Sequence, residues 1–330
     1  MNWLENFKNI KVEITSYCNA KCPGCTRNIT GGAVMPQLEI NHMPLELWDR
    51  IMNIDTKGMH LEEVLFDGNV GDICMHPQAI DFIKTTIKAH PETHISVNTN
   101  GGARNQAFWE EIGSIVKDQP HRFNFAIDGL EDTHHIHRRS TSYDMVVRNM
   151  KAFTKGGGQA NWVYTIFDHN THQVRDAHFR ATQADCHWFQ TRWSCIDGSD
   201  MYTKTDKEEY SIGTETIYDY EEEFHVLRDI IPHKEPEDAG HKCNAFNEKQ
   251  IQIDFRGILW PCSYIYSTEV YNNDPLDSSP FIRDMEHPGS GLSLYKHSLT
   301  DILNSKFFKE QLPKAIEDEK LEICNKWCFN

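Results

Sequence analysis

The sequence lacks any apolar run long enough to cross a lipid bilayer, which takes about 20 consecutive apolar residues in a helix. It also lacks the basic segment followed by an apolar one that marks an N-terminal secretory signal. No low-complexity tract or internal repeat is evident in the 330 residues. These absences predict a globular protein of the cytoplasm, with no membrane as a partner.

Positive charge is also in short supply. Lys and Arg number 33 against 49 Asp and Glu, and the formal net charge at pH 7 is −16. A surface this negative repels phosphate backbones, and no cluster of Lys and Arg stands out, so no nucleic-acid partner is expected. Acidic residues are densest over 206–223, which we interpret as a solvated surface segment.

Cysteine, in contrast, is abundant, with ten residues in the chain. In a reducing compartment these residues do not predict a disulfide framework. Three of them fall within residues 18–25 and two within 324–328. Clustering at such short spacing indicates metal binding.

Strand and helix signals alternate along the first 193 residues. Strands are expected over residues 10–16, 64–66, 95–98, 123–127, 162–167 and 187–193, with helices that begin near 44 and 77 or span 107–116, 145–153 and 174–184. This alternation predicts an α/β fold with a parallel sheet and right-handed crossovers. Polar and glycine residues follow most of the strands, which predicts an active site at the carboxyl ends of the strands, as in α/β barrels.

The alternation ends after Gly198. We expect a barrel-like domain over residues 1–205, an acidic connecting segment over 206–240 and a small α+β domain over 241–330. In the small domain, two strand signals flank Arg256-Gly257, which predicts a β-hairpin with its turn at these residues.

Cys18, Cys22 and Cys25 are spaced C-x3-C-x2-C on the loop that leaves the first expected strand. Three thiolates can hold three irons of a [4Fe–4S] cubane. The fourth iron then stays open to a substrate or cofactor, as in catalytic metal sites that keep a free position. A zinc site would need a fourth ligand nearby, and no other Cys or His lies between residues 18 and 40. The spacing therefore favours an iron–sulfur cluster over zinc.

A second set of cysteines lies towards the C-terminus. Cys243 and Cys262 form a C-x13-G-x4-C pattern with Gly257, and Cys324 and Cys328 follow. Four thiolates suffice to ligate a second cubane completely. They also suit a structural Cys₄ zinc site, which the spacing alone does not exclude.

These motifs resemble those of the radical S-adenosylmethionine (SAM) superfamily over nearly the whole chain. The C-x3-C-x2-C loop after the first strand is the defining motif of that family. The stretch from Gly68 to Pro77 resembles its glycine-rich motif, in which an acidic residue binds the SAM amino group, and Asp72 stands at that place. The residues that the resemblance assigns to SAM are Gly71, Asp72, Asn100, Asp128 and Arg138.

The sequence departs from the family pattern at two positions. Gly24 stands where an aromatic residue usually packs on the adenine, and Ala126 stands where Ser is common. His169 and Asn170 follow the fifth expected strand, and we expect them to line the cavity near the adenine.

The resemblance implies a partial (β/α)6 TIM-like barrel followed by a small α+β auxiliary-cluster domain. It implies a [4Fe–4S] cluster with an open site for SAM, reductive cleavage of SAM to a 5′-deoxyadenosyl radical, and removal of a hydrogen atom from a substrate. A flavodoxin- or ferredoxin-type reductant is the implied electron donor. The second cysteine set resembles the opening of the family's SPASM and twitch extensions, and four cysteines fit the shorter twitch form with one auxiliary [4Fe–4S] cluster.

Two residues near the sixth expected strand are candidates for action on the substrate. Cys195 is a candidate hydrogen-atom donor for an epimerisation. Arg192 is either an anchor for an anionic substrate group or an Arg at the edge of the core. Structural rather than catalytic roles are expected for other conspicuous side chains. These roles are hydrogen bonding or solvation for His134, His135 and His137, and packing for Cys74, Cys186, Trp162 and Phe167.

The substrate class stays open at this point. Peptide or protein modification is favoured, because it is a frequent activity among the members of the family with such extensions. Dehydrogenation or epimerisation of a small molecule such as an amino sugar is the alternative within the family. A non-catalytic zinc or iron–sulfur binding protein is the alternative outside it.

Overall fold

The computed structural model describes residues 1–29, 31–194, 202–204, 209–211, 243–266, 291–321, 324 and 328. Cys195 lies outside the described residues, as does the acidic segment expected over 206–240, apart from a short strand at 209–211. In the part of the chain that is described, no helix is long and apolar enough to span a membrane.

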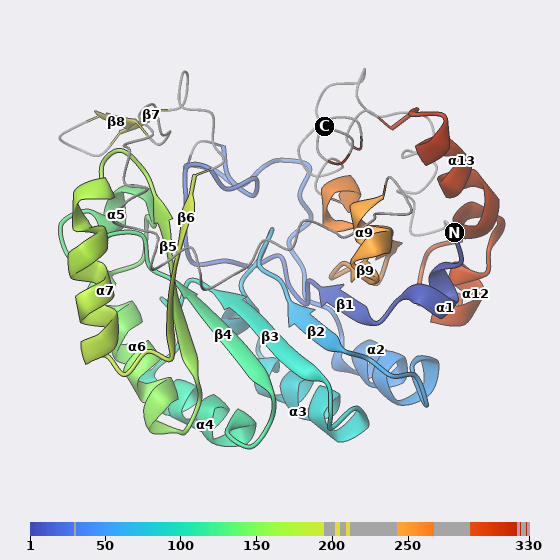
Figure 1. The fold of residues 1–330 in the computed structure, drawn as a ribbon, viewed down its shortest axis with the longest axis horizontal. Coiled ribbons are helices and arrows are strands. Elements are labelled where there is room, and N and C mark those ends of the chain that lie inside the picture. Colours follow the sequence, from blue (N-terminus) through green and yellow to red (C-terminus); the bar gives the residue numbers. More distant parts are fainter. Residues whose placement is uncertain are drawn as a thin grey trace. The chain divides into compact units, whose positions relative to one another are not determined.

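The fold is α/β, and six strands that alternate with helices form a parallel sheet, as the sequence predicts (Figure 1). The strands are β1 (Asn9–Val12), β2 (Glu63–Phe66), β3 (His94–Thr99), β4 (His121–Ala126), β5 (Ala160–Ile166) and β6 (Trp188–Trp193). The helices among them are α2 (Leu45–Arg50), α3 (Ala79–Ala89), α4 (Gln106–Val116), α5 (His134–His137), α6 (Tyr143–Lys155) and α7 (Val174–Gln183).

The remaining elements are short. They are the helices α1 (Trp3–Asn6), α9 (Asn244–Asn247), α12 (Leu299–Leu303) and α13 (Leu312–Glu317), the π-helical turns η1 (Ile51–Asp55) and η4 (Phe307–Gln311), the 3-10 turns η2 (Ile73–Met75) and η3 (Thr171–Gln173), and the antiparallel pair β7 (Tyr202–Lys204) and β8 (Glu209–Ser211).

Two strands from the C-terminal part of the chain extend the sheet. Its strand order is β10-β9-β1-β2-β3-β4-β5-β6, with β9 at Gln250–Ile253 and β10 at Leu259–Trp260. β9 pairs in parallel with β1, and β10 pairs antiparallel with β9. The predicted hairpin is therefore confirmed, and β9 lies beside the first strand of the sheet.

The turn of this hairpin is fixed by two residues. Gly257 has φ +71°, a conformation that residues with a side chain rarely adopt. The buried carboxylate of Asp254 accepts hydrogen bonds from the backbone N–H of Arg256 at 2.9 Å and of Ile258 at 3.1 Å. The turn is thus held from within the hairpin itself.

The chain divides into two compact units that are not contiguous in sequence. Unit 1 comprises residues 1–17, 36–96 and 236–330, and unit 2 comprises residues 18–35 and 97–235, so the division falls within β3. These units are defined by which residues pack together. The three-part division expected from the sequence stays a prediction.

In unit 1, α2 and α3 cover one face of β1 and β2. The ring of Trp48 in α2 lies 5.9 Å from that of Phe66 in β2 and 6.1 Å from that of Phe82 in α3. Val12 pairs with Phe66 and therefore points to the same side. The residues that follow these two in the chain, Glu13 and Asp67, point to the opposite side of the sheet.

In unit 2, α4 and α6 pack so closely that side chains are excluded between them. A Cβ on Gly113 of α4 would lie 2.1 Å from the carbonyl oxygen of Phe153 in α6. A Cβ on Gly156, just after α6, would lie 2.2 Å from the carbonyl oxygen of Glu110. Trp162 and Phe167 are buried, as predicted.

The close approach of α4 and α6 predicts the effect of Gly113→Ala. Ala normally favours a helix over Gly by about 1 kcal/mol. Here its Cβ would overlap backbone, so we expect destabilisation by about 1–3 kcal/mol. The urea midpoint of unfolding measures this, with Ser114→Ala on the exposed face of the same helix as the control. A Gly113→Ala midpoint as high as that of Ser114→Ala would contradict the packing described.

Candidate active site around the N-terminal cysteines

The loop that carries Cys18, Cys22 and Cys25 belongs to unit 2. Cys22 is buried, and the other two are half-buried. Tight backbone turns shape the loop: Cys25 N–H donates to the carbonyl of Cys22 at 3.1 Å. Lys21 N–H donates to the carbonyl of Arg139 at 2.9 Å, which ties the loop to the segment after α5.

Two N–H donors of unit 2 point at the thiols of this loop. The Nδ2 of Asn100 lies 3.6 Å from Cys18 Sγ and 3.0 Å from Asn19 Oδ1. A guanidinium nitrogen of Arg138 lies 3.9 Å from Cys22 Sγ. Such donors stabilise a thiolate and tune a metal bound to it. The two predicted residues Asn100 and Arg138 are therefore brought to the cysteines.

Burial and charge act in opposite directions on Cys22. Burial raises the pKa of its thiol to about 11, and the nearby Arg138 charge lowers it. A bound cation would remove the cost of the buried thiolate. Three cysteines on one short loop, with N–H donors on two of them, fit the ligand set of a [4Fe–4S] cluster with one open iron.

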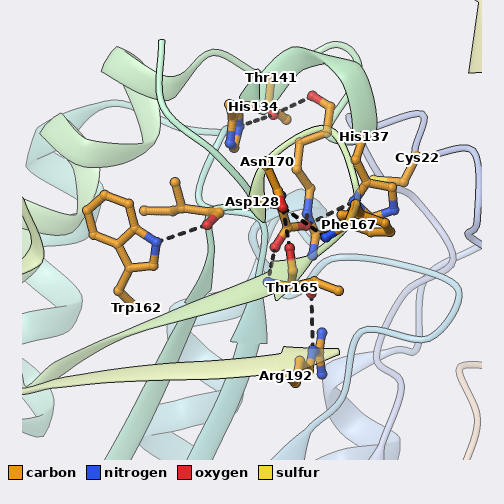
Figure 2. A network of polar contacts seen from close by, with 12 residues as sticks. Cys22, Asp128, His134, His137, Thr141, Trp162, Thr165, Phe167, Asn170 and Arg192 are labelled. Atoms are coloured by element: carbon orange, nitrogen blue, oxygen red, sulfur yellow. Dashed lines mark hydrogen bonds and ion pairs between the residues drawn. The ribbon is translucent and has the colours of Figure 1, made fainter. Parts of the chain in front are cut away.

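Asp128 fixes the position of Arg138, and Figure 2 shows Asp128 beside His137 and Thr165. Its carboxylate is fully buried and accepts from Arg138 Nε at 2.6 Å, from His137 Nδ1 at 2.9 Å and from the backbone N–H of Thr165 at 2.7 Å. Burial alone would raise the pKa of Asp128, but the charge of Arg138 and the hydrogen bond from His137 hold it well below its usual range. Asp128 thus holds Arg138 in place, and the donors to its carboxylate all come from within the protein.

Two histidines of α5 are hydrogen-bonded and the third is exposed, in keeping with the hydrogen bonding or solvation expected for them. His137 binds Asp128, and its ring lies 4.4 Å from that of Phe167. The Nε2 of His134 lies 3.0 Å from Thr141 Oγ1. Burial lowers the pKa of His134 to about 3, so this ring is neutral near pH 7. His135 is exposed.

The two residues expected near the adenine differ in their surroundings. Asn170 is fully buried, and its side chain accepts from Phe167 N–H at 2.8 Å and donates to the Thr165 carbonyl at 3.0 Å. These bonds stabilise the turn after β5, and the proximity of Asn170 to the adenine stays a prediction. His169 is half-buried and stacks on Phe167 with ring centroids 5.2 Å apart.

Arg192, the predicted substrate anchor, lies in β6 and is exposed. Its Nε donates to Thr165 Oγ1 at 3.2 Å (Figure 2). This bond orients the guanidinium towards the carboxyl-terminal half of β5. It also links Arg192 to the residue of β5 whose backbone N–H donates to Asp128.

The glycine-rich segment belongs to unit 1. A Cβ on Gly71 would lie 1.9 Å from the carbonyl oxygen of Thr15, so only Gly fits there. Asp72 is buried and caps η2, because its carboxylate accepts from Cys74 N–H at 3.0 Å. Cys74 is buried, in keeping with the packing role expected for it.

The second cysteine set also belongs to unit 1. Cys243, Cys262 and Cys324 are buried, and Cys328 N–H donates to the Cys324 carbonyl at 2.8 Å. Burial raises the pKa of Cys262 to about 12, and the neighbouring Cys243 and Cys328 thiols add to this shift. The four thiols are thus close enough to influence one another. Among the residues that the structure describes, however, no three His, Cys, Asp or Glu side chains form a group that could hold a single metal ion, and this is true of the N-terminal cysteine loop as well as of this set.

Comparison with solved structures finds proteins of similar fold. SuiB of Streptococcus suis bound to its precursor peptide SuiA has a TM-score of 0.59 and 13% identity, over 93% of this chain and 67% of that one. Native anSMEcpe with bound AdoMet has a TM-score of 0.57 and 13% identity, over 93% and 83%. At such identities the likeness concerns the fold.

The chain is shorter than some of these proteins. SuiB bound to SAM has a TM-score of 0.54 and 12% identity, and the match covers 79% of this chain and 61% of that one. A search of curated proteins found no match.

The family described as the radical SAM superfamily matches residues 12–179. That match spans just over half of the chain and contains the cysteine loop, Gly71, Asp72 and the Asp128–Arg138 pair. This chain therefore belongs to the radical SAM superfamily.

Proposed function

We propose that this protein is an enzyme that cleaves SAM reductively and uses the resulting 5′-deoxyadenosyl radical to remove a hydrogen atom from its substrate. The observation that carries this proposal is the cysteine loop with its two N–H donors, Asn100 on Cys18 and Arg138 on Cys22. When bound by the three cysteines, a [4Fe–4S] cluster supplies the electron for this cleavage and an open iron for SAM.

The role of Arg138 follows from its charge and its position. A cation beside a thiolate ligand stabilises the reduced, more negative state of a bound cluster and so raises its reduction potential. Asp128 holds the guanidinium at that place through a 2.6 Å ion pair. In this proposal Asp128 and His137 are positioning residues, and Arg138 is the group that contacts the cluster ligand.

Contacts with SAM itself are proposed for Gly71 and Asp72, with His169 near the adenine. The resemblance assigns the SAM amino group to the acidic residue at position 72. No side chain fits at Gly71, because the backbone of this segment lies very close to its neighbours. A close approach of this kind supports the proposal.

A second, closed [4Fe–4S] cluster is proposed at Cys243, Cys262, Cys324 and Cys328. Its support is that these thiols lie near one another in unit 1 and that three of them are buried. A complete set of four thiolates leaves no iron open, so this cluster would relay electrons or stabilise the C-terminal part of the chain. The electron donor proposed for the protein is a flavodoxin or ferredoxin.

Peptide or protein modification is the substrate class that we propose first. It is supported by the peptide complexes among similar folds, SuiB with SuiA and anSMEcpe with the Cp18Cys peptide. Arg192 is proposed as an anchor for an anionic group of that substrate, because its guanidinium is exposed and oriented by Thr165.

The direct test is the formation of 5′-deoxyadenosine from SAM by the anaerobically reconstituted protein with dithionite. Wild type is expected to form it, and Cys22→Ala is expected to lose at least 99% of the rate, because three thiolates are needed to hold the cluster. Cys186→Ala, which removes a half-buried thiol outside the motif, is the matched control and keeps the activity. A wild type that forms none would sink the proposal.

Iron content tests the second cluster. Two cubanes predict about eight irons per wild-type chain and about four in the double variant Cys324→Ala/Cys328→Ala. Iron, sulfide and zinc are measured together by elemental and colorimetric analysis. Stoichiometric zinc with about four irons in wild type would mean that these cysteines hold a structural zinc ion instead.

The proposed role of Arg138 predicts a lower reduction potential in Arg138→Gln. A charge-assisted hydrogen bond contributes about 1.5–3 kcal/mol, so we expect a decrease of about 60 mV or more for a one-electron couple. The potential is measured by a redox titration followed by electron paramagnetic resonance, in the variant without Cys324 and Cys328. His135→Gln, on the exposed side of α5, is the control. Equal potentials in all three proteins would contradict the role of Arg138.

A further inference from the structure

Unit 1 contains buried polar atoms without partners that the proposed SAM chemistry does not use. Glu13 Oε2 and both polar atoms of the Gln252 side chain have no hydrogen-bond partner, although the two residues are only 1% and 0% exposed. Burying polar atoms without partners is unfavourable, and most such atoms in proteins are satisfied. Three unpartnered atoms therefore need an explanation.

The strand register puts these atoms on one face of the sheet. Lys11 in β1 pairs with Gln252 in β9, and Glu13 continues the same strand two residues further on. Glu13 N–H donates to the Ile253 carbonyl at 2.9 Å, so the pairing with β9 continues to this residue. Because side chains two residues apart in a strand point to the same side, Glu13 and Gln252 are diagonal neighbours.

The surroundings of Glu13 are acidic. Asp67 N–H donates to the Val12 carbonyl at 2.9 Å, and this pairing puts Asp67 beside Glu13 on the same face. Asn69 connects the two, because its N–H donates to Glu13 Oε1 at 2.7 Å and its side chain donates to Asp67 at 2.9 Å. In the described part of unit 1, no Lys or Arg forms an ion pair with Glu13. Burial, and then the charge of Asp67, raise the pKa of Glu13 well above its usual range, although hydrogen bonds from Asn69 and from the backbone of Val70 act in the opposite direction. A cation beside the carboxylate would offset the cost of its buried charge.

The unpartnered atoms also define which chemical groups of a ligand could form hydrogen bonds with them. Glu13 Oε2 and Gln252 Oε1 each accept a hydrogen bond, and Gln252 Nε2 donates one. A protonated primary amine carries a positive charge and three N–H donors, two of which would match these acceptors. An oxygen on the neighbouring carbon supplies the acceptor.

We propose that Glu13 and Gln252 form a binding site for a protonated primary amine with an oxygen acceptor next to it. Such a group is found in amino alcohols, amino sugars among them, and at the N-terminus of a peptide. The substrate of the proposed reaction would then carry this group, and in this respect the inference rests on the proposed function. The binding itself does not depend on SAM cleavage.

A neighbouring glutamine in β9 provides a matched control. Gln250 lies two residues before Gln252 and points to the same side of the sheet. Its side-chain Nε2 donates to Glu248 at 2.5 Å, so its amide has a partner within the chain. A ligand could therefore supply hydrogen-bond partners to the Gln252 amide, whereas the Gln250 amide already has one.

The test is a titration of the full-length, reconstituted protein, labelled with ¹⁵N in the side-chain amide of glutamine. The probes are 2-aminoethanol hydrochloride for amino alcohols and glycinamide hydrochloride for a peptide N-terminus. Tetramethylammonium chloride, a cation without N–H donors, is the control probe. Samples are equilibrated overnight because both side chains are buried, and Gln252→Met assigns the Gln252 resonance.

A saturable shift of the Gln252 resonance with one or both amines, and none with tetramethylammonium, is expected. Glu13→Gln should weaken that binding at least tenfold, and Gln250→Met should leave it unchanged. No shift with either amine, or equal shifts with tetramethylammonium, would overturn the inference. Formation of 5′-deoxyadenosine by the same wild-type sample is measured in parallel, so a failure of the amine site is distinguished from a failure of the proposed function.

Discussion

The buried ion pair between Asp128 and Arg138 is the interaction on which the rest of the site depends. A carboxylate with no exposed surface needs strong donors, and Asp128 obtains them from Arg138, His137 and the backbone of Thr165. These partners come from α5, the segment after it and β5. Their convergence holds a positive charge 3.9 Å from the sulfur of Cys22, where an iron–sulfur cluster would be ligated.

The sequence predicted those features that repeat or cluster along the chain. Apolar strands followed by polar turns predicted the six-strand parallel sheet, and Gly257 with its flanking strand signals predicted the hairpin. The spacing of Cys18, Cys22 and Cys25 identified the loop that the family match contains. These signals are local, and local patterns are what a single sequence records best.

Features that arise from convergence in space could not be predicted in the same way. Nothing in the sequence around Asp128 indicates that its carboxylate accepts from three donors. Likewise, nothing around Asn170 indicates that its amide is bound to the turn after β5. The pairing of β9 with β1 joins residues 241 positions apart, so the proximity of Glu13 to Gln252 became visible only in the fold. That pairing brings the unpartnered Oε2 of Glu13 close to the two unpartnered side-chain atoms of Gln252.

The most direct measurement is the electron paramagnetic resonance spectrum of the reduced protein without and with SAM, in the variant Cys324→Ala/Cys328→Ala. If Cys18, Cys22 and Cys25 hold a cluster with an open iron, the variant is expected to give the signal of one reduced [4Fe–4S] cluster whose g values change when SAM is added, because SAM occupies the open position. A spectrum that is absent, or identical with and without SAM, would contradict the assignment of this loop to SAM cleavage.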